Sequence, residues 1–431
     1  MKTSKKLRSM LLTGTAALLL MSTVACGSGE KDAAEPEKVT LNIMHPWTSP
    51  NVDNEVYKER IAEFEKQHPD IIIKQDGVAA TEYKTKLRTL AAANNLSDIN
   101  VVWPGADLAP LVAGDLLMPL DGLMDNWKDI LPEDALAGFN QNNSQFAVPT
   151  KQTFVDIIYY NKEMFAEVGY DQFPATYEEF IDAVKKLKEA GITPISLGNK
   201  EKWPLQSSFL SIIGDRYVGS DFLQKILNKE AKFTDPEYVK AIAVIDELAK
   251  LEAFNTDANN MDSVQGQDYF IQGKAAMHIS SSTVDGRIRI NNEEGDKFGI
   301  ALFPSVPGGS GDPVKSAGVV QYGISIKKGL SDEKKAAAEE FIKFFVNEDL
   351  YKDLISKGVV VPANVEIPED ASPYLKEMLE LTNKGTAPVF DSVIPTQVTD
   401  VMQNGLQALT IGRGTPEELA QEVQEAFDSM K

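Results

Sequence analysis

The stretch VTLNIM, residues 39–44, opens the part of the chain that decides the fold. It predicts a strand, and residues 57–64 follow with apolar side chains on one helical face. Residues 71–74 and 99–103 predict two more strands, separated by a helical pattern at residues 83–91. Strands that alternate with amphipathic helices in this way pair in parallel and connect through right-handed crossovers. The segment therefore predicts a parallel sheet flanked by helices.

A second unit begins near Asp156, because residues 157–160 predict a strand that leads into a helix. Thr176-Tyr177-Glu178-Glu179 forms a capping box at the start of an amphipathic helix, and residues 234–237 repeat the pattern. Without residues 1–25 the chain has 406 residues, which is more than one hydrophobic core usually holds. We therefore predict an α/β fold with two lobes. Further strands are predicted at residues 275–280, 298–303 and 322–326.

The N-terminal segment has the features of a secretory leader. Basic residues precede an apolar run at residues 11–20, which is too short to span ~30 Å of hydrocarbon. Ala25 stands directly before Cys26, the only cysteine of the chain. This arrangement resembles a bacterial lipobox, which implies cleavage after residue 25 and a lipid such as palmitate on the Cys26 thiol. The alternative is an ordinary cleaved leader that happens to contain a cysteine. Residues 26–38 predict a flexible tether.

Composition excludes several classes of partner and site. The formal net charge is −21, and it becomes −25 without the four basic residues of the leader. A field of this sign repels nucleic acid and anionic headgroups, so neither is an expected partner. The three histidines, His45, His68 and His278, have no metal-ligand spacing, so no metal site is predicted. With Cys26 committed to an anchor, no disulfide can form.

Several short stretches match one protein family in their order and spacing. They lie at residues 64–71, 98–103, 113–120, 148–149, 158–165, 174–180, 273–277, 318–327 and 341–345. The sequence resembles the extracellular solute-binding lipoproteins of carbohydrate ABC importers, which are related to maltose-binding protein. The resemblance covers nearly all of the chain after the leader. One departure is the run from Ser280 to Thr283, where many members have a tryptophan that stacks on sugar.

The resemblance implies a two-lobed, periplasmic-binding-protein-like clamshell of type II. Each lobe would contain a mostly parallel sheet flanked by helices, and the chain would cross between the lobes three times. Lobe 1 would comprise residues 39–150 and 321–365, and lobe 2 residues 155–317 and 385–431. The implied function is capture of a sugar, and in particular an oligosaccharide, for delivery to ABC permease subunits. The protein would act as a monomer outside the cytoplasmic membrane, without a cofactor and without catalysis.

Tryptophans in loops are the first candidates for ligand binding. Sugars present apolar C–H faces and hydroxyl groups, so their sites combine flat aromatic rings with polar side chains. Trp47 and Trp103 each follow a predicted parallel strand, at the edge where open α/β sheets bind ligands. Asp107 follows Trp103 in the same loop, and the family has a tryptophan and an aspartate there. Trp203 lies in a loop that matches one beside the family's cleft. The alternative for each tryptophan is a packing role in the core.

Polar residues near the three crossings are the second group of candidates. Side chains at such crossings face the cleft between the lobes in this family, although each could instead be a solvated hinge residue. The predicted ligand-binding residues of this group are Lys151, Gln152, Asp156, Gln321 and Asp391, together with Phe390 beside Asp391.

A lipid-anchored extracellular hydrolase is the alternative from a different class of protein. The sequence contains no nucleophile elbow, zinc-binding His-Glu-x-x-His motif or phosphate loop, and we predict no catalytic residue. Residues 331–334 fit the Ser-x-x-Lys pattern of β-lactamases but lack its companion motifs, and they lie where a helix cap belongs. A second alternative is a binding protein for a solute other than a sugar, although the lack of an evident arginine cluster weighs against phosphates.

Overall fold

The leader, Cys26 and nearly all of the tether fall outside the residues that the structure describes, so those predictions concern the sequence alone. Within the described part of the chain, no helix combines the length and apolar character needed to cross a membrane. The computed structural model describes residues 38–430, apart from 283, 285, 286, 289–296, 370, 372 and 383.

The opening segment forms the parallel sheet that its sequence predicts. Strand β1 (Val39–His45) pairs in parallel with β2 (Ile71–Gly77) and with β3 (Ile99–Val102). Helix α1 (Val52–Gln67) connects β1 to β2, and α2 (Ala80–Ala92) connects β2 to β3. The carboxyl ends of the three strands therefore lie at one edge of the sheet, and the loops after them lie side by side.

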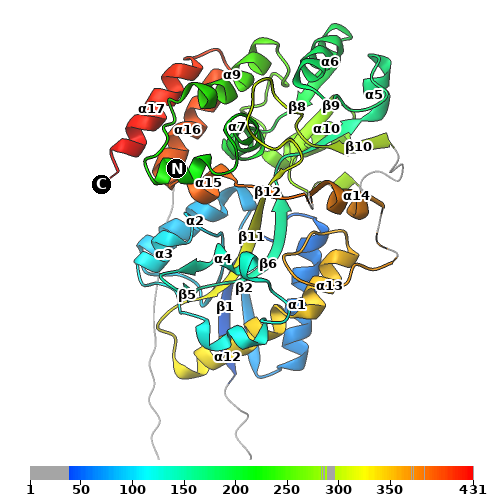
Figure 1. The fold of residues 1–431 in the computed structure, drawn as a ribbon. Coiled ribbons are helices and arrows are strands. Elements are labelled where there is room, and N and C mark those ends of the chain that lie inside the picture. The colour runs from blue at the N-terminus through cyan, green and yellow to red at the C-terminus, as the bar shows by residue number, and fades with distance from the viewer. Residues whose placement is uncertain are drawn as a thin grey trace, which may run out of the picture. The chain divides into compact units, whose positions relative to one another are not determined.

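Three later segments complete this first sheet and make it mixed. Strand β11 (Ser316–Ile326) pairs antiparallel with β3 and with β6 (Val148–Phe154). The short β12 (Thr386–Ala387) pairs in parallel with the start of β11. The strand order is β12-β11-β3-β1-β2, with β6 beside β11. Segments far apart in sequence thus meet on β11, as Figure 1 shows.

The second sheet has the order β10-β7-β9-β8. In it β7 (Ile157–Asn161) pairs antiparallel with both β9 (Ala275–Ser280) and β10 (Phe298–Ala301). Only β8 (Thr193–Ser196) and β9 run in parallel. The prediction of a mostly parallel sheet is therefore wrong for this lobe. Alternation of strands and helices along the sequence predicts parallel pairing only where a single helix joins two adjacent strands. Residues 162–274 separate β7 from β9, so the direction of this pair does not follow from the alternation.

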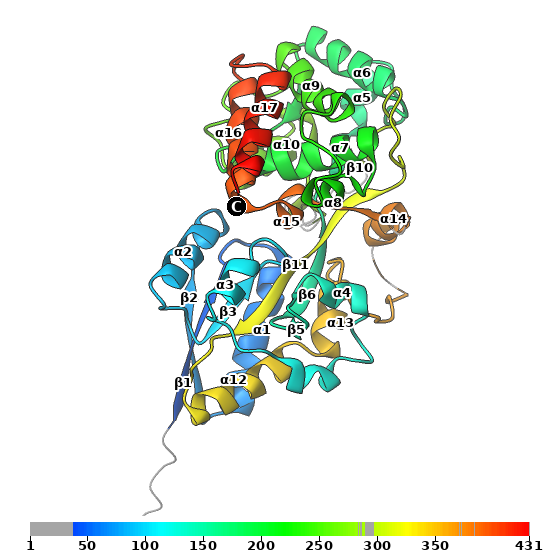
Figure 2. The same cartoon turned by 60° about the vertical axis from the view of Figure 1, so that its left-hand side comes forward.

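Helices cover both sheets (Figures 1 and 2). Two helices pack on the first sheet, α12 (Asp332–Phe345) and α13 (Glu348–Ser356). The helices near the second sheet are η2 (Pro204–Leu210), α7 (Ser211–Val218), α9 (Pro236–Lys250), α10 (Ser263–Ile271), α16 (Thr396–Leu409) and α17 (Pro416–Asp428). The remaining elements are α3 (Ala109–Ala113), η1 (Asp121–Asn126), α4 (Glu133–Ala137), β4 (Asn140–Gln141), β5 (Ser144–Gln145), α5 (Lys162–Glu167), α6 (Tyr177–Glu189), α8 (Phe222–Leu227), α14 (Pro373–Thr382) and α15 (Phe390–Val393).

The two predicted capping boxes have different outcomes. The Thr176 hydroxyl accepts a hydrogen bond from the Glu179 amide, and the Glu179 carboxylate accepts one from the Thr176 amide, so this box is confirmed. The box at residues 234–237 is wrong, because α9 begins at Pro236 with Asp235 as its N-cap residue. Proline at the first helical position suits a helix start by itself, since it needs no amide partner.

Each sheet has its own buried core. One cluster of buried apolar side chains surrounds β1, β3 and α12, and another surrounds β8, α7 and α9. We call β1, β2, β3, β6 and the later part of β11, with their core, the first lobe. The second sheet with its core, which also contains Ala317 and Ala387, is the second lobe. The chain passes between the lobes at the end of β6, along β11 and after α13. This is the two-lobed α/β arrangement that the sequence predicts.

Candidate functional site

Trp103 is the aromatic side chain that marks the candidate site. It directly follows β3 and is half-buried. The Tyr322 ring packs edge-on against it with ring centroids 5.0 Å apart, and the Tyr83 ring lies 5.5 Å away. The ammonium group of Lys84 lies 5.0 Å from the centroid of the Trp103 ring. Aromatic and cationic neighbours thus hold the indole in place while part of it stays exposed.

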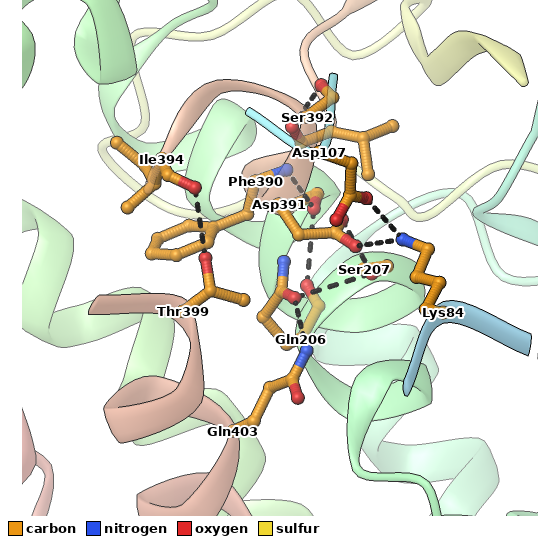
Figure 3. Close-up of polar contacts among 12 residues, drawn as sticks. Lys84, Asp107, Gln206, Ser207, Phe390, Asp391, Ser392, Ile394, Thr399 and Gln403 are labelled. Atoms are coloured by element: carbon orange, nitrogen blue, oxygen red, sulfur yellow. Dashed lines mark hydrogen bonds and ion pairs between the residues drawn. The ribbon is translucent and has the colours of Figure 1, made fainter. Parts of the chain in front are cut away.

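Lys84, which lies over the Trp103 ring, also belongs to a cluster of charged and polar side chains that Figure 3 shows. Lys84 Nζ lies 2.6 Å from Asp107 Oδ2 and 3.8 Å from Asp391 Oδ2. The Ser207 hydroxyl donates a hydrogen bond of 3.0 Å to the other oxygen of Asp391. Burial alone would lower the pKa of Lys84, but the nearby carboxylates outweigh it and raise that pKa above its ordinary value. We call Lys84, Asp107, Asp391 and Ser207 the carboxylate bridge.

The carboxylate bridge joins the two lobes. Lys84 and Asp107 belong to α2 and to the loop after β3, whereas Ser207 and Asp391 belong to η2 and α15. Beside the bridge, the Gln403 side-chain amide donates to Gln206 Oε1 at 3.1 Å, within the second lobe.

Backbone groups also meet between the lobes. The Ala106 amide donates a long hydrogen bond of 3.4 Å to the Ser392 carbonyl. Gly105 has φ +61°, and a Cβ atom there would lie 2.2 Å from the same carbonyl oxygen. Glycine at position 105 therefore permits both the turn and the close approach of α15.

A cavity of about 440 Å³ lies where the crossing strands meet the loop after β3. This volume is within the usual range for small-molecule sites. Its polar side chains include those of Gln152, Asn364 and Thr386, and the rest of its lining is mainly small or apolar. Pro104 and Gly105 border it, so it adjoins the loop that carries Trp103 and Asp107. The other lining residues are Pro132, Ala135, Gly138, Gly318, Val319, Val320, Val361, Pro362, Ala363 and Ser392.

Trp47, a predicted ligand residue, is fully buried in the first lobe. His45 and Phe345 stack on it with centroid distances of 4.8 Å and 5.5 Å, and Tyr57 packs at 4.5 Å. In this structure the indole is therefore part of an aromatic cluster and is separate from the carboxylate bridge.

Lys151 is also buried, at the first crossing. Its ammonium group pairs with Asp53 and lies 4.7 Å from the centroid of the Tyr322 ring. Side-chain exposure is 4% for Lys151 and 3% for Asp53. Tyr322 also packs against Trp103, so this ring lies between Lys151 and the candidate site.

Asp156 is buried where the chain leaves the first lobe. Its Oδ1 accepts a hydrogen bond of 2.6 Å from the Ser316 hydroxyl, and its Oδ2 has no hydrogen-bond partner among the described residues. Burial raises the pKa of Asp156 to about 6, although the Ser316 hydrogen bond and the Arg216 charge oppose that shift. Arg216 in turn donates to the backbone carbonyls of Phe303, Asp312 and Lys315, so these groups tie the first and second crossings together.

The remaining predicted residues lie in three different surroundings. Gln152 lines the cavity, and Gln321 is half-buried and accepts a hydrogen bond of 2.7 Å from the Thr153 hydroxyl. Trp203 is half-buried directly before η2. Phe390 is buried in the second core, next in sequence to Asp391 of the bridge.

The structure therefore brings together Trp103, Asp107 and Asp391 among the predicted residues. Sequence reasoning missed Lys84, Ser207 and Gln206. Lys84 lies in an ordinary amphipathic helix, where a lysine is usually solvated, and nothing in the sequence links it to Asp391. Thr283, at the end of the run that departs from the family pattern, lies outside the described residues.

Comparison with known proteins places the chain in a family. Residues 47–352 match the family of bacterial extracellular solute-binding proteins, and the chain belongs to that family. It is therefore an extracellular solute-binding protein of the class that serves ABC transporters, and the resemblance found in the sequence is confirmed.

Individual relatives agree with this assignment. The multiple sugar-binding protein of Streptococcus mutans is 25% identical over 399 residues, which cover 88% of each chain. An uncharacterized ABC transporter extracellular-binding protein of Pyrococcus horikoshii is 27% identical over 297 residues, which cover 65% of each chain. A solved structure of a chitin oligosaccharide binding protein superposes with a TM-score of 0.84 at 24% identity, covering 91% of this chain and 98% of that one. The fold is thus that of the type II periplasmic binding proteins.

Proposed function

We propose that this protein captures a sugar, and in particular an oligosaccharide, between its lobes and delivers it to the permease of an ABC importer. The observation that carries the proposal is the half-buried Trp103 beside the carboxylates of Asp107 and Asp391, next to a cavity of about 440 Å³. The exposed part of the indole can stack on the C–H face of a sugar, and carboxylates accept hydrogen bonds from the sugar hydroxyls.

Closure around the ligand is the proposed mechanism. A ligand that contacts both lobes binds the closed arrangement more tightly than the open one, and this difference in affinity shifts the population. The lobes proposed for this motion comprise residues 39–150 with 321–365, and residues 155–317 with 385–431. The names of the Streptococcus mutans relative and of the chitin oligosaccharide binding protein support a sugar as cargo.

The tether is the second part of the proposal. A lipid on Cys26 would hold the protein at the outer face of the cell membrane, and the flexible residues after it would leave the lobes free to move. An anchor also raises the effective concentration of a monomeric receptor at its permease. Membrane fractionation of the native protein and of Cys26→Ala tests this: the variant should move to the soluble fraction, and retention at the membrane would overturn the anchor.

Calorimetric titration of the purified protein, residues 27–431, with xylo-, malto- and chito-oligosaccharides tests the cargo. We expect micromolar binding of one series, which corresponds to about −8 kcal/mol. Chromatography of the recovered sugar separates a receptor from a hydrolase, because a receptor returns the sugar unchanged. Absence of heat with every sugar, together with binding of a peptide or a phosphodiester, would replace the carbohydrate assignment.

A further inference from the structure

Lys84 occupies a position between two carboxylates from different lobes. Its Nζ atom is 2.6 Å from Asp107 Oδ2 in the first lobe and 3.8 Å from Asp391 Oδ2 in the second. Side-chain exposure is 30% for Lys84, 20% for Asp107 and 22% for Asp391. The three groups are therefore partly shielded from water, and their electrostatic interaction is stronger than that of fully solvated ions.

We propose that Lys84 is a positioning residue that joins the two lobes and orients the carboxylates of the ligand site. This rests on the proposed function in one respect, namely that Asp107 and Asp391 face the sugar. Lys84 holds the Asp107 carboxylate directly, and it attracts Asp391 when α15 comes near the loop after β3. Ser207 orients the opposite oxygen of Asp391 from within the second lobe.

The surrounding charges explain why Lys84 should affect the contact between the lobes more than a neighbouring lysine does. One ammonium group faces two carboxylates, one from each lobe. Its removal therefore leaves two negative charges facing each other where the lobes meet. Their repulsion would favour separation of the lobes. Lys86, on the same helix, pairs with Asp76 at 2.7 Å within the first lobe, with side chains 41% and 46% exposed. Such an exposed pair contributes little, so Lys86 is a matched control.

Scattering without ligand tests the interlobe part of the proposal. Small-angle X-ray scattering would compare the ligand-free native protein with Lys84→Gln and Lys86→Gln at 20 and 500 mM NaCl. We expect a larger radius of gyration for Lys84→Gln at low salt and a native value for Lys86→Gln. High salt should bring the native protein toward the radius of Lys84→Gln, because salt screens the bridge. Equal radii for all three proteins would overturn the interlobe role.

Titration with sugars tests the orienting part. Maltotriose, xylotriose and chitotriose would each be titrated into the native protein, Lys84→Gln, Lys84→Arg and Lys86→Gln. With any trisaccharide that binds, Lys84→Gln should weaken affinity roughly fivefold, whereas Lys84→Arg and Lys86→Gln should stay within about twofold of the native value. In the scattering experiment, adding Asp391→Asn to Lys84→Gln should bring the radius of gyration back toward the native value, since it relieves the repulsion.

The two experiments separate the failure of this inference from that of the proposed function. If no trisaccharide binds but the radii differ as expected, the interlobe role stands and the carbohydrate assignment is the weaker part. If a trisaccharide binds with the same affinity to the native protein and Lys84→Gln, the orienting role is wrong while the carbohydrate assignment stands. Far-ultraviolet circular dichroism of each variant checks that it is folded.

Discussion

Trp47 and Trp103 occupy equivalent places in the sequence but opposite surroundings in the structure. Each follows a parallel strand of the first sheet at the edge that faces the second lobe. Trp47 is fully buried between His45 and Phe345, whereas Trp103 is half-buried. The difference arises from α12, which brings Phe345 onto the first indole from a segment almost 300 residues later. Position at a strand end therefore identifies a candidate ligand-binding residue. Packing by residues far away in the sequence decides whether its side chain is accessible.

Two lysines that form ion pairs show the same contrast in burial. Lys151 and Asp53 form a pair that is almost completely buried, whereas Lys84 pairs with Asp107 at a partly exposed site. A buried pair is costly to break because one charge is then left without a partner, and an exposed pair is not. The buried members of the predicted site should therefore affect stability, and the accessible members should affect binding.

Alanine substitution of the two tryptophans should give a large difference in the free energy of unfolding. Trp47→Ala should lower the free energy of unfolding by about 3–5 kcal/mol, because it leaves a cavity in a packed aromatic cluster. Trp103→Ala should lower it by roughly 1 kcal/mol, since part of that ring already contacts water. Urea unfolding followed by circular dichroism measures both. Similar losses for the two variants would mean that the contrast in burial does not hold in solution.

The two lysines should show a comparable difference in stability. Lys151→Met should cost about 3–5 kcal/mol of stability because Asp53 remains buried without a counter-charge. Lys84→Met should cost about 1 kcal/mol or less. Adding Asp53→Asn to Lys151→Met should restore much of the loss if the uncompensated carboxylate is its cause. Urea unfolding at neutral pH checks all three variants, and no recovery in the double variant would contradict this explanation.

Asp156, another buried charged residue, should make the stability of the protein depend on pH. Its pKa is about 6 in the folded protein and near 3.8 when unfolded, so the folded state binds more protons between these values. Stability should therefore fall as pH rises from about 4 to about 6 and stay level above, with a total loss of roughly 3 kcal/mol from this group. The pH dependence of urea unfolding measures this. Asp156→Asn keeps an acceptor for Ser316 and should flatten that part of the profile; an unchanged slope would assign it to other groups.

The effect on binding should be smaller than the stability loss in Trp47→Ala or Lys151→Met, but it is the clearest one for function. Trp103→Ala should weaken the affinity for a bound oligosaccharide by about 2 kcal/mol, or roughly 30-fold, through loss of a stacking surface. Trp103→Phe should keep part of that surface and lose less. Calorimetric titration measures both, and native affinity in Trp103→Ala would remove this ring from the site.

Prediction from sequence succeeded where the signal is local. Apolar periodicity located β1, α1, β2, α2 and β3, and the Thr176 box marked the start of α6. It failed at the second box, where a proline and a neighbouring aspartate begin the helix instead of Thr234. It also failed for strand direction in the second sheet, because β7 meets β9 and β10 across long intervening segments.

The sequence by itself determined the alternation of strands and helices, the family, and a set of candidate residues at strand ends and crossings. These features depend on residue type and spacing within a few turns of chain. Only the tertiary structure decided which candidates are accessible and that Lys84 meets Asp391. Those contacts join segments about 300 residues apart, and no local pattern encodes them, because they result from how the helices pack on each sheet and how the crossings bring the two lobes together.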